Sequence, residues 1–404
     1  MTRSPVARAA LVVALAAAWL VSAYLLWQTS VVPGSLHLPH IDVHDYFSAA
    51  QLREAARFGQ FSSRLWIAST VVELVVFVLY AKWGVRFMRE SAAGPVGTGM
   101  LLGMIGFALL WLAELPFDVL GLWWERRHGL SHEGYFEHVT ANWFALGGQF
   151  VFLCVALGVA MGFARWLGDW WWIPAAAFFV GLATLFAFVD PYLLSTHKLH
   201  DAELAGQVRA LERAEGVGHV PVAVQPVHTV TAMPNAEAMG LGPSRRIVLW
   251  DTLVDGRFSE RELRVVLAHE IGHLARHHIR KEVAWYALFA FPGVYFLMRI
   301  TRRRGGMGEP EAVPLALLAL VVLGLLALPL QNAISRHMEA EADWMALRTT
   351  RDPAAATQLF RQFVTTTLDE PSPSTWDYVL LENHPTIAQR IAMAQAWRSW
   401  SARH

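Results

Sequence analysis

The stretch VPLALLALVVLGLLALPL, residues 313–330, decides the fold class of this chain. It carries no charged side chain, and a helix of about 20 apolar residues is long enough to cross the hydrocarbon core of a bilayer. The rest of the sequence agrees, because 55% of the 404 residues are hydrophobic and 16% are charged, which is too apolar for an ordinary soluble surface. The sequence therefore predicts a mainly α, polytopic membrane protein.

Six further apolar runs reach spanning length, and tryptophans crowd the ends of several, as interfacial anchors do. These runs are residues 9–27, 65–82, 100–122, 143–163, 170–189 and 283–300. We expect the first to be a retained anchor rather than a cleaved signal peptide, because it is long for a signal peptide and no clear small-residue cleavage site follows it. Together the runs predict about seven transmembrane helices.

Two polar blocks interrupt or follow these runs. The first contains a helical pattern, AELAGQVRALERAEG (202–216), and then a strand-rich part at 220–256 with Pro, Asn and Gly turns. The second block has mostly helical patterns. We therefore divide the chain into four parts: an N-terminal membrane region at 1–190, a polar domain with a small β segment at 191–282, two more membrane helices at 283–330, and the C-terminal part of the polar domain at 331–404.

The first polar block ends in LAHEIGHLARHH, residues 267–278, which holds four histidines and one glutamate. His269 and His273 are four residues apart on a predicted helix, so both rings project from one face and can bind one ion. Glu270 lies beside the position that this ion leaves open. This is the HExxH arrangement, in which two histidines bind zinc and the glutamate takes a proton from the attacking water. We therefore expect one Zn²⁺ per chain.

Two features flank this motif. Ser259 and Glu262 have the spacing of a capping box, which predicts the start of the helix. His277 and His278 follow a turn after the histidine pair, and we interpret them as a solvated or interfacial polar cluster, because an HExxH site does not need them.

A third zinc ligand is expected in SRHMEAEADWMAL, residues 335–347, directly after the seventh apolar run. Glu339 and Asp343 are four residues apart and share one helical face, so one can bind the ion while the other orients a ligating histidine. Glu341 lies about 200° from Glu339 around the helix, so the two carboxylates cannot both face the zinc. We expect Glu339 to be the ligand and replacement of Glu341 to have little effect.

The residues resemble a known family. HEIGH (269–273), followed by two apolar spans and SRHMEAEAD (335–343), is similar to the zinc metalloendopeptidases of the CAAX prenyl protease 1 family and to their relatives, the membrane heat-shock proteases. The segment LPFDVLGLWWERRHGLS (115–131) resembles the LPF…E…HGF signature of the CAAX branch. PNAEAMG (234–240) and NHPTIAQRI (383–391) resemble two further family segments, so the resemblance covers most of the chain in the same order.

This resemblance implies zinc on His269, His273 and Glu339, with Glu270 as general base and acid. Asp343 would hold a ligating histidine in place. The implied fold is a barrel of seven transmembrane helices around a water-filled chamber, capped by the zinc domain.

The resemblance also implies two residues that act on the substrate. Asn235 would hold the substrate backbone, and His384 would stabilise the oxyanion at the scissile carbonyl. The segment AMPNAEAMG (232–240) lacks the serine and histidine that precede the asparagine in some eukaryotic members, which puts the substrate preference in doubt.

Three acidic residues interrupt the predicted membrane spans, namely Glu73, Glu114 and Asp118. An ionisable group at bilayer depth is costly unless it faces water or a partner. We expect these residues to face the chamber, with a buried pair between packed helices as the alternative.

We therefore predict a multi-pass zinc metalloendopeptidase of the gluzincin type, in the cell membrane if the source is bacterial. Its substrates would be peptides or proteins, with or without a prenyl group, in CAAX-type processing or membrane protein quality control. The alternative is an inactive transporter or receptor with a structural zinc site.

The net charge of zero gives no reason to expect nucleic acid as a partner. The side of the zinc domain stays open, because the positive-inside rule places it outside the cytoplasm and the resemblance implies the cytosol.

Overall fold

The computed structural model describes residues 5–86 and 91–403. In this part of the chain, six helices are long and apolar enough to cross a membrane. They are α2 (Ala49–Trp83), α3 (Gly94–Arg127), α4 (Tyr135–Leu167), α5 (Trp172–Leu193), α8 (His278–Thr301) and α9 (Val313–Thr350). A further apolar helix, α1 (Pro5–Trp27), precedes them. The predicted runs fall within these seven helices, except that α5 begins two residues after the predicted start, so the mainly helical fold class is confirmed.

Most of these helices extend well beyond the apolar runs. Helix α2, for example, starts at a complete capping box between Ser48 and Gln51, and it has 35 residues. At 1.5 Å per residue, such a helix is about 50 Å long, which exceeds the apolar thickness of a bilayer. Polar ends of the helices can therefore stand outside the hydrocarbon region.

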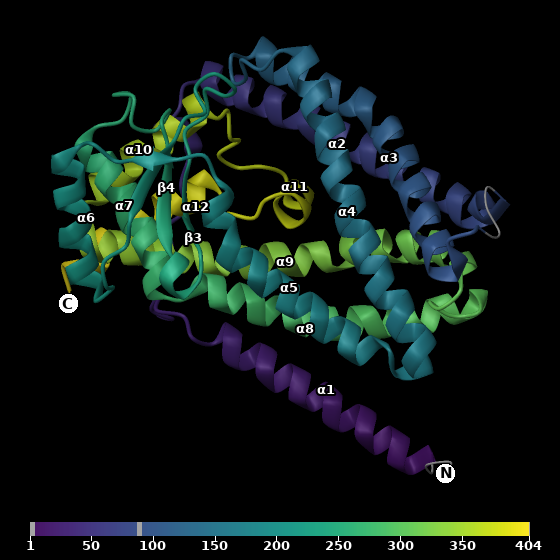
Figure 1. Cartoon of the computed structure of the whole chain (residues 1–404). Helices are drawn as coiled ribbons and strands as arrows, with labels where there is room; N and C mark the ends of the chain where they lie inside the picture. The colour runs from purple at the N-terminus through teal and green to yellow at the C-terminus, as the bar shows by residue number, and fades with distance from the viewer. Residues whose placement is uncertain (1–4, 87–90, 404) are drawn as a thin grey trace.

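The long helices form a frame with two sides (Figure 1). Helices α2, α3 and α4 make one side, and α5, α8 and α9 make the other. The sides meet at the end far from the β-sheet. There α3 and α9 pack closely at Gly106 of α3, because a Cβ at this glycine would lie 2.8 Å from Cδ1 of Leu317 in α9. Helix α1 lies along α8, and the indole of Trp19 donates a hydrogen bond of 2.7 Å to the carbonyl oxygen of Leu288.

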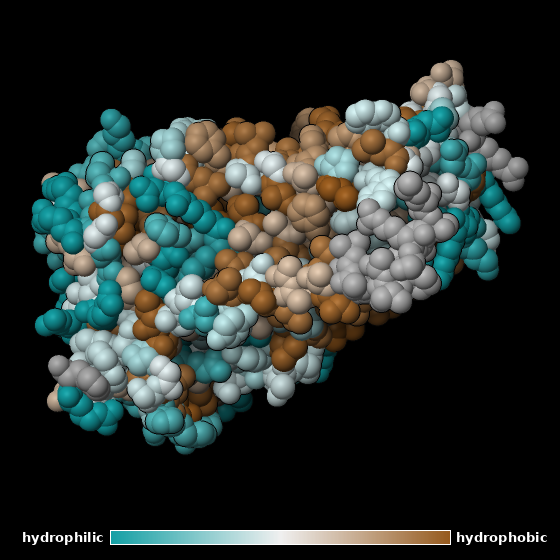
Figure 2. Space-filling view, turned by 90° about the horizontal axis from the view of Figure 1, so that it is seen from below, coloured by the Kyte–Doolittle hydropathy of each residue, from teal (hydrophilic) through white to brown (hydrophobic). Residues whose placement is uncertain are grey.

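Hydrophobic side chains cover the middle of the frame, and hydrophilic residues gather at both ends (Figure 2). Between α2, α3 and α4 the helices enclose a cavity of about 480 Å³, lined in part by the polar residues Ser69, Asp118, Glu125, His138 and Asn142. Asp118 thus faces a cavity, as expected from the sequence. Glu114 accepts a hydrogen bond of 2.7 Å from the hydroxyl of Ser69.

A small sheet and four further helices form the other end of the molecule, and a fifth, α11, lies between the two sides of the frame (Figure 1). The strands lie in the order β1-β2-β4-β3; β2 and β4 are parallel, and β1 and β3 pair antiparallel with their neighbours. The strands are β1 (His197–Lys198), β2 (Val222–Gln225), β3 (Ala236–Met239) and β4 (Arg246–Trp250). The helices are α6 (Ala202–Glu215), α7 (Glu260–Ala275), α10 (Pro353–Thr366), α11 (Thr375–Leu380) and α12 (Ile387–Ser401).

Helix α7 lies in the middle of the main hydrophobic core and crosses the C-terminal half of α9. The predicted capping box is present, because the Glu262 carboxylate accepts a hydrogen bond of 2.8 Å from the backbone N–H of Ser259. A Cβ at Gly272 would lie 3.1 Å from Cβ of Met345 and 3.4 Å from Cα of Ala342. The two helices therefore approach closely at this glycine.

Candidate metal centre

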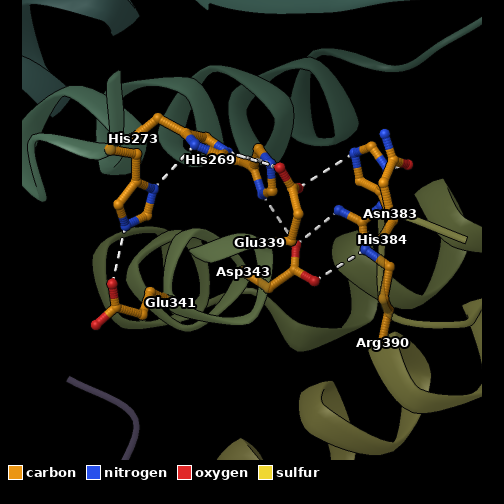
Figure 3. Close-up of polar contacts among 9 residues, drawn as sticks. His269, His273, Glu339, Glu341, Asp343, Asn383, His384 and Arg390 are labelled. Carbon is orange, nitrogen blue, oxygen red and sulfur yellow. Dashed lines mark hydrogen bonds and ion pairs between the residues drawn. The ribbon is translucent and has the colours of Figure 1, made fainter. Parts of the chain in front are cut away.

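His269 and His273 of α7 face Glu339 of α9 (Figure 3). Their Nε2 atoms are 3.0 Å apart. Glu339 Oε2 lies 3.2 Å from His269 Nε2, and Glu339 Oε1 lies 3.4 Å from His273 Nε2. In the described part of the chain these three residues are the group whose donor atoms lie close enough to hold a metal ion.

The donor atoms fit zinc in number, type and spacing. For ligand atoms about 2.0–2.1 Å from a tetrahedral ion, neighbouring ligand atoms are about 3.3 Å apart, which is close to the three distances above. Glu339 Oε2 is also buried without a hydrogen-bond partner among the described residues, a costly state that an ion would remove. Two imidazoles and one carboxylate leave a fourth position free, as catalytic zinc sites do.

Asp343 holds His269 in its orientation. Asp343 Oδ1 lies 2.9 Å from His269 Nδ1, and Arg390 of α12 donates two hydrogen bonds of 2.7 and 2.8 Å to the same carboxylate. Burial alone would lower the pKa of His269, but the neighbouring carboxylates of Asp343 and Glu339 raise that pKa to about 10. The sequence pointed to Asp343 through its spacing from Glu339; it did not reveal Arg390 as the partner of Asp343, because that contact joins residues far apart in the chain.

The remaining predicted site residues, Asn235, Glu270 and His384, line one cavity of about 400 Å³ together with His269. Glu270 is buried beside the first ligand. His384 comes from the loop before α12, and its Nε2 lies 3.3 Å from Glu339 Oε2. Asn235 directly precedes the edge strand β3, and its backbone oxygen accepts a hydrogen bond of 2.9 Å from the N–H of Trp250. The structure thus brings all of these residues to one place.

The far wall of this cavity is formed by α10 and by the loops that precede and follow α11. Phe360 and Phe363 supply apolar surface, and Asp369, Glu370 and Glu382 supply carboxylates. Burial, together with the nearby charges of Asp369 and Asp377, raises the pKa of Glu382 to about 7.

The interpretation of the flanking histidines is wrong for one of them. His277 is exposed, whereas His278 is 1% exposed and its Nδ1 lies 2.9 Å from His273 Nδ1. His278 Nε2 in turn lies 2.9 Å from Oε2 of Glu341, which is fully buried. Glu341 does point away from Glu339, as predicted (Figure 3). Helix geometry placed it correctly on the other face, but it could not show that α8 packs against that face.

Comparison with known proteins identifies the family. The sequence profile described as peptidase family M48 matches residues 198–398. A protein named protease HtpX homolog from Kineococcus radiotolerans is 31% identical over 221 residues, which cover 48% of this chain and 74% of that protein. The chain belongs to peptidase family M48.

Two further similarities span nearly the whole M48 chain. The uncharacterized metalloprotease YhfN of Bacillus subtilis is 23% identical over 403 residues, covering 92% of each chain. The crystal structure of Ste24p from S. mikatae has a TM-score of 0.76 and 18% identity, covering 94% of this chain and 96% of the other. The chain thus has the fold of Ste24p and is a multi-pass integral membrane metallopeptidase with the ligands His269, His273 and Glu339. The similarities support the M48 family as a whole rather than its CAAX branch alone.

Proposed function

We propose that this M48 protein is an endopeptidase that cleaves membrane-associated proteins, with Glu270 as its general base. One observation carries the proposal: Glu270, Asn235 and His384 line the same cavity as the ligand His269. A peptide that enters this cavity would therefore meet the metal, a base and two polar groups at once.

Each residue has a distinct role in this proposal. Bound zinc supplies a Lewis acid that activates water and polarises the scissile carbonyl. Glu270 takes the proton of the attacking water and passes it to the leaving amine. Asn235 hydrogen-bonds the substrate backbone beside the edge strand β3. His384 Nδ1 lies 2.7 Å from Asn383 Oδ1, an acceptor, so that nitrogen carries a proton. In the imidazolium form His384 also donates from Nε2 to the developing oxyanion.

The substrate class is proposed at two levels. A general role in membrane protein quality control agrees with the similarity to a protein named protease HtpX homolog. CAAX-type processing of prenylated proteins is the more specific candidate, since the segment 115–131 that resembles the CAAX branch contributes Phe117, Asp118 and Glu125 to the lining of the cavity between α2, α3 and α4.

The alternative function is a structural zinc site in an inactive transporter or receptor. A structural zinc site is closed by four protein ligands and needs no base. Here Glu270 lies beside the ligands and lines an adjoining cavity, which favours catalysis.

The test replaces Glu270 by Gln in the full-length chain. The amide keeps the shape of the side chain but cannot accept a proton, so we expect full zinc occupancy and a loss of peptidase activity of about a hundredfold or more. Glu262→Gln on the same helix is the matched control, and it should keep native activity because glutamine also completes a capping box. Near-native turnover by Glu270→Gln would overturn the proposal.

The same variant identifies substrates. Membranes that contain Glu270→Gln should accumulate proteins that membranes with the native chain do not. Prenylated C-terminal peptides among them would support CAAX-type processing, and a broad set of membrane proteins would support quality control.

A further inference from the structure

The two histidine ligands are held in different ways. Each directs Nε2 toward the metal position, which leaves its Nδ1 to be fixed by another group. For His269 that group is Asp343, at 2.9 Å. For His273 it is a second histidine, His278, whose Nδ1 is 2.9 Å from His273 Nδ1.

His278 is tied to a buried carboxylate on its other side. Its Nε2 is 2.9 Å from Oε2 of Glu341, a residue with no exposed surface. Lys281 Nζ donates to the same oxygen at 2.9 Å, and the backbone N–H of Val31 donates to Oε1 at 3.1 Å. Arg276 adds a positive charge 3.7 Å from Oε1. These donors stabilise the ionised form of Glu341, which accepts hydrogen bonds and cannot donate them.

One set of proton positions satisfies every contact in this chain of residues. A metal on His273 Nε2 requires the proton of the neutral ring to sit on Nδ1. That N–H can donate only if His278 Nδ1 is an acceptor, so the proton of His278 sits on Nε2. From there it is donated to Glu341. The ionised carboxylate thus fixes the tautomer of both rings.

We propose that His278 and Glu341 are positioning residues that fix the tautomer and ring orientation of His273 for metal binding. This inference rests on the metal centre of the proposed function. It gives His273 the same kind of support that Asp343 gives His269, with a second imidazole placed between ligand and carboxylate. Loss of such support typically costs 10–100-fold in metal affinity.

The same residues join the centre to the segment after α1. Glu341 accepts from the N–H of Val31, and the guanidinium of Arg276 donates to the carbonyl oxygen of Thr29. The ring of Trp27 stacks on His337 at a centroid distance of 4.3 Å. The connection between α1 and α2 is therefore held against the helix that carries Glu339, on the side opposite to the metal.

Two substitutions of His278 separate positioning from packing. Phenylalanine fills the space of the ring but cannot accept a hydrogen bond, whereas asparagine is smaller and places an acceptor oxygen near the position of Nδ1. We expect His278→Phe in the full-length chain to weaken zinc binding by about 10–100-fold, and His278→Asn to stay within about threefold of native. Affinity is measured by competition with a chelator. If His278→Phe binds zinc as tightly as the native chain, or more tightly than His278→Asn, the residue acts by packing and the proposal is overturned.

A second pair of variants covers the case in which His278→Phe does not fold. Glu341→Gln keeps the shape of the side chain and removes its charge. The sequence alone predicted little effect at Glu341, but its bond to His278 changes that expectation. We expect Glu341→Gln to weaken zinc binding about threefold to tenfold and to shift the visible absorption bands of the Co²⁺-loaded protein, because His273 becomes a weaker donor to the metal. The control is Glu262→Ala, which removes another buried carboxylate, in the first turn of α7; it should lower the melting temperature without shifting these bands. Unchanged bands and affinity in Glu341→Gln would overturn the proposal.

These measurements are independent of peptide cleavage. A native chain that binds zinc but cleaves nothing would contradict the proposed function, and the differences among the His278 variants would still decide whether the positioning residues act as proposed.

Discussion

The carboxylates of the metal centre and those of the membrane helices are the same chemical group in two different settings. Glu339, Glu341 and Asp343 are buried, and each lies close to imidazole nitrogens, with cations beside two of them. On α3, Glu114 has a single hydroxyl partner, and Asp118 faces a cavity. A buried charge is tolerated only where fixed donors replace water. The metal centre is therefore preorganised by fixed donors, whereas Asp118 faces a cavity that water can enter.

The largest effect is expected at Glu339. Glu339→Ala leaves two nitrogen ligands, which are too few for a stable zinc site, so the purified chain should contain almost no zinc. His269→Ala and His273→Ala should behave in the same way. Metal analysis of the purified variants is the measurement, and full zinc occupancy in Glu339→Ala would mean that the carboxylate of the centre has been misidentified.

A smaller effect is expected at Asp343. Asp343→Ala removes the partner of His269 and leaves Arg390 without its carboxylate, so zinc affinity should fall about 10–100-fold while some binding persists. Chelator competition measures this loss. Asp343→Asn retains an acceptor and should lie between the native chain and Asp343→Ala; an order in which Asn is worse than Ala would contradict this role.

Glu382 is intermediate between the carboxylates of the metal centre and those of the membrane helices, because it is partly buried and its pKa is raised to about 7. The unfolded chain ionises this group near its ordinary pKa, which is below the folded value. The contribution of Glu382 to stability is therefore full below the ordinary pKa and is lost as pH rises from there through 7. Glu382→Gln removes this dependence. We expect thermal unfolding to show that the variant gains stability relative to the native chain between about pH 5 and pH 8. A constant difference across this range would exclude the effect.

The smallest effect on the metal is expected in the membrane helices. Glu114→Gln and Asp118→Asn should leave zinc affinity within about twofold of native, since neither residue contacts the centre and a neutral side chain costs less at bilayer depth. The melting temperature should be unchanged or higher. A large loss of zinc in either variant would show that the two regions are coupled, and the comparison above would fail.

Local rules were sufficient for the parts of the molecule that depend on helix geometry. Apolar run length gave the membrane helices, and a spacing of four residues gave the pairs His269 with His273 and Glu339 with Asp343. In each case the information lies within a few turns of one helix.

Contacts between distant segments could not be found in this way. The spacing rule shows that Glu341 faces away from Glu339, but not that His278, Lys281 and the backbone of Val31 meet it there. Arg390 lies 47 residues from Asp343 in the sequence, and no periodic pattern links the two. The support of the metal ligands is a property of the assembled fold, so it becomes visible only in three dimensions.

Helix α9 also connects the metal ligand Glu339 directly to a membrane span. It runs from Val313 to Thr350 as one helix of 38 residues, about 57 Å long, and carries both the apolar span and the ligand Glu339. A change in bilayer thickness is accommodated by helix tilt, and a tilt of α9 swings Glu339 relative to the histidines on α7. Pro329, between the span and the ligand, interrupts the helix hydrogen bonds and is the place where α9 can bend. We therefore expect zinc affinity to depend on the acyl-chain length of the lipid in which the protein is reconstituted.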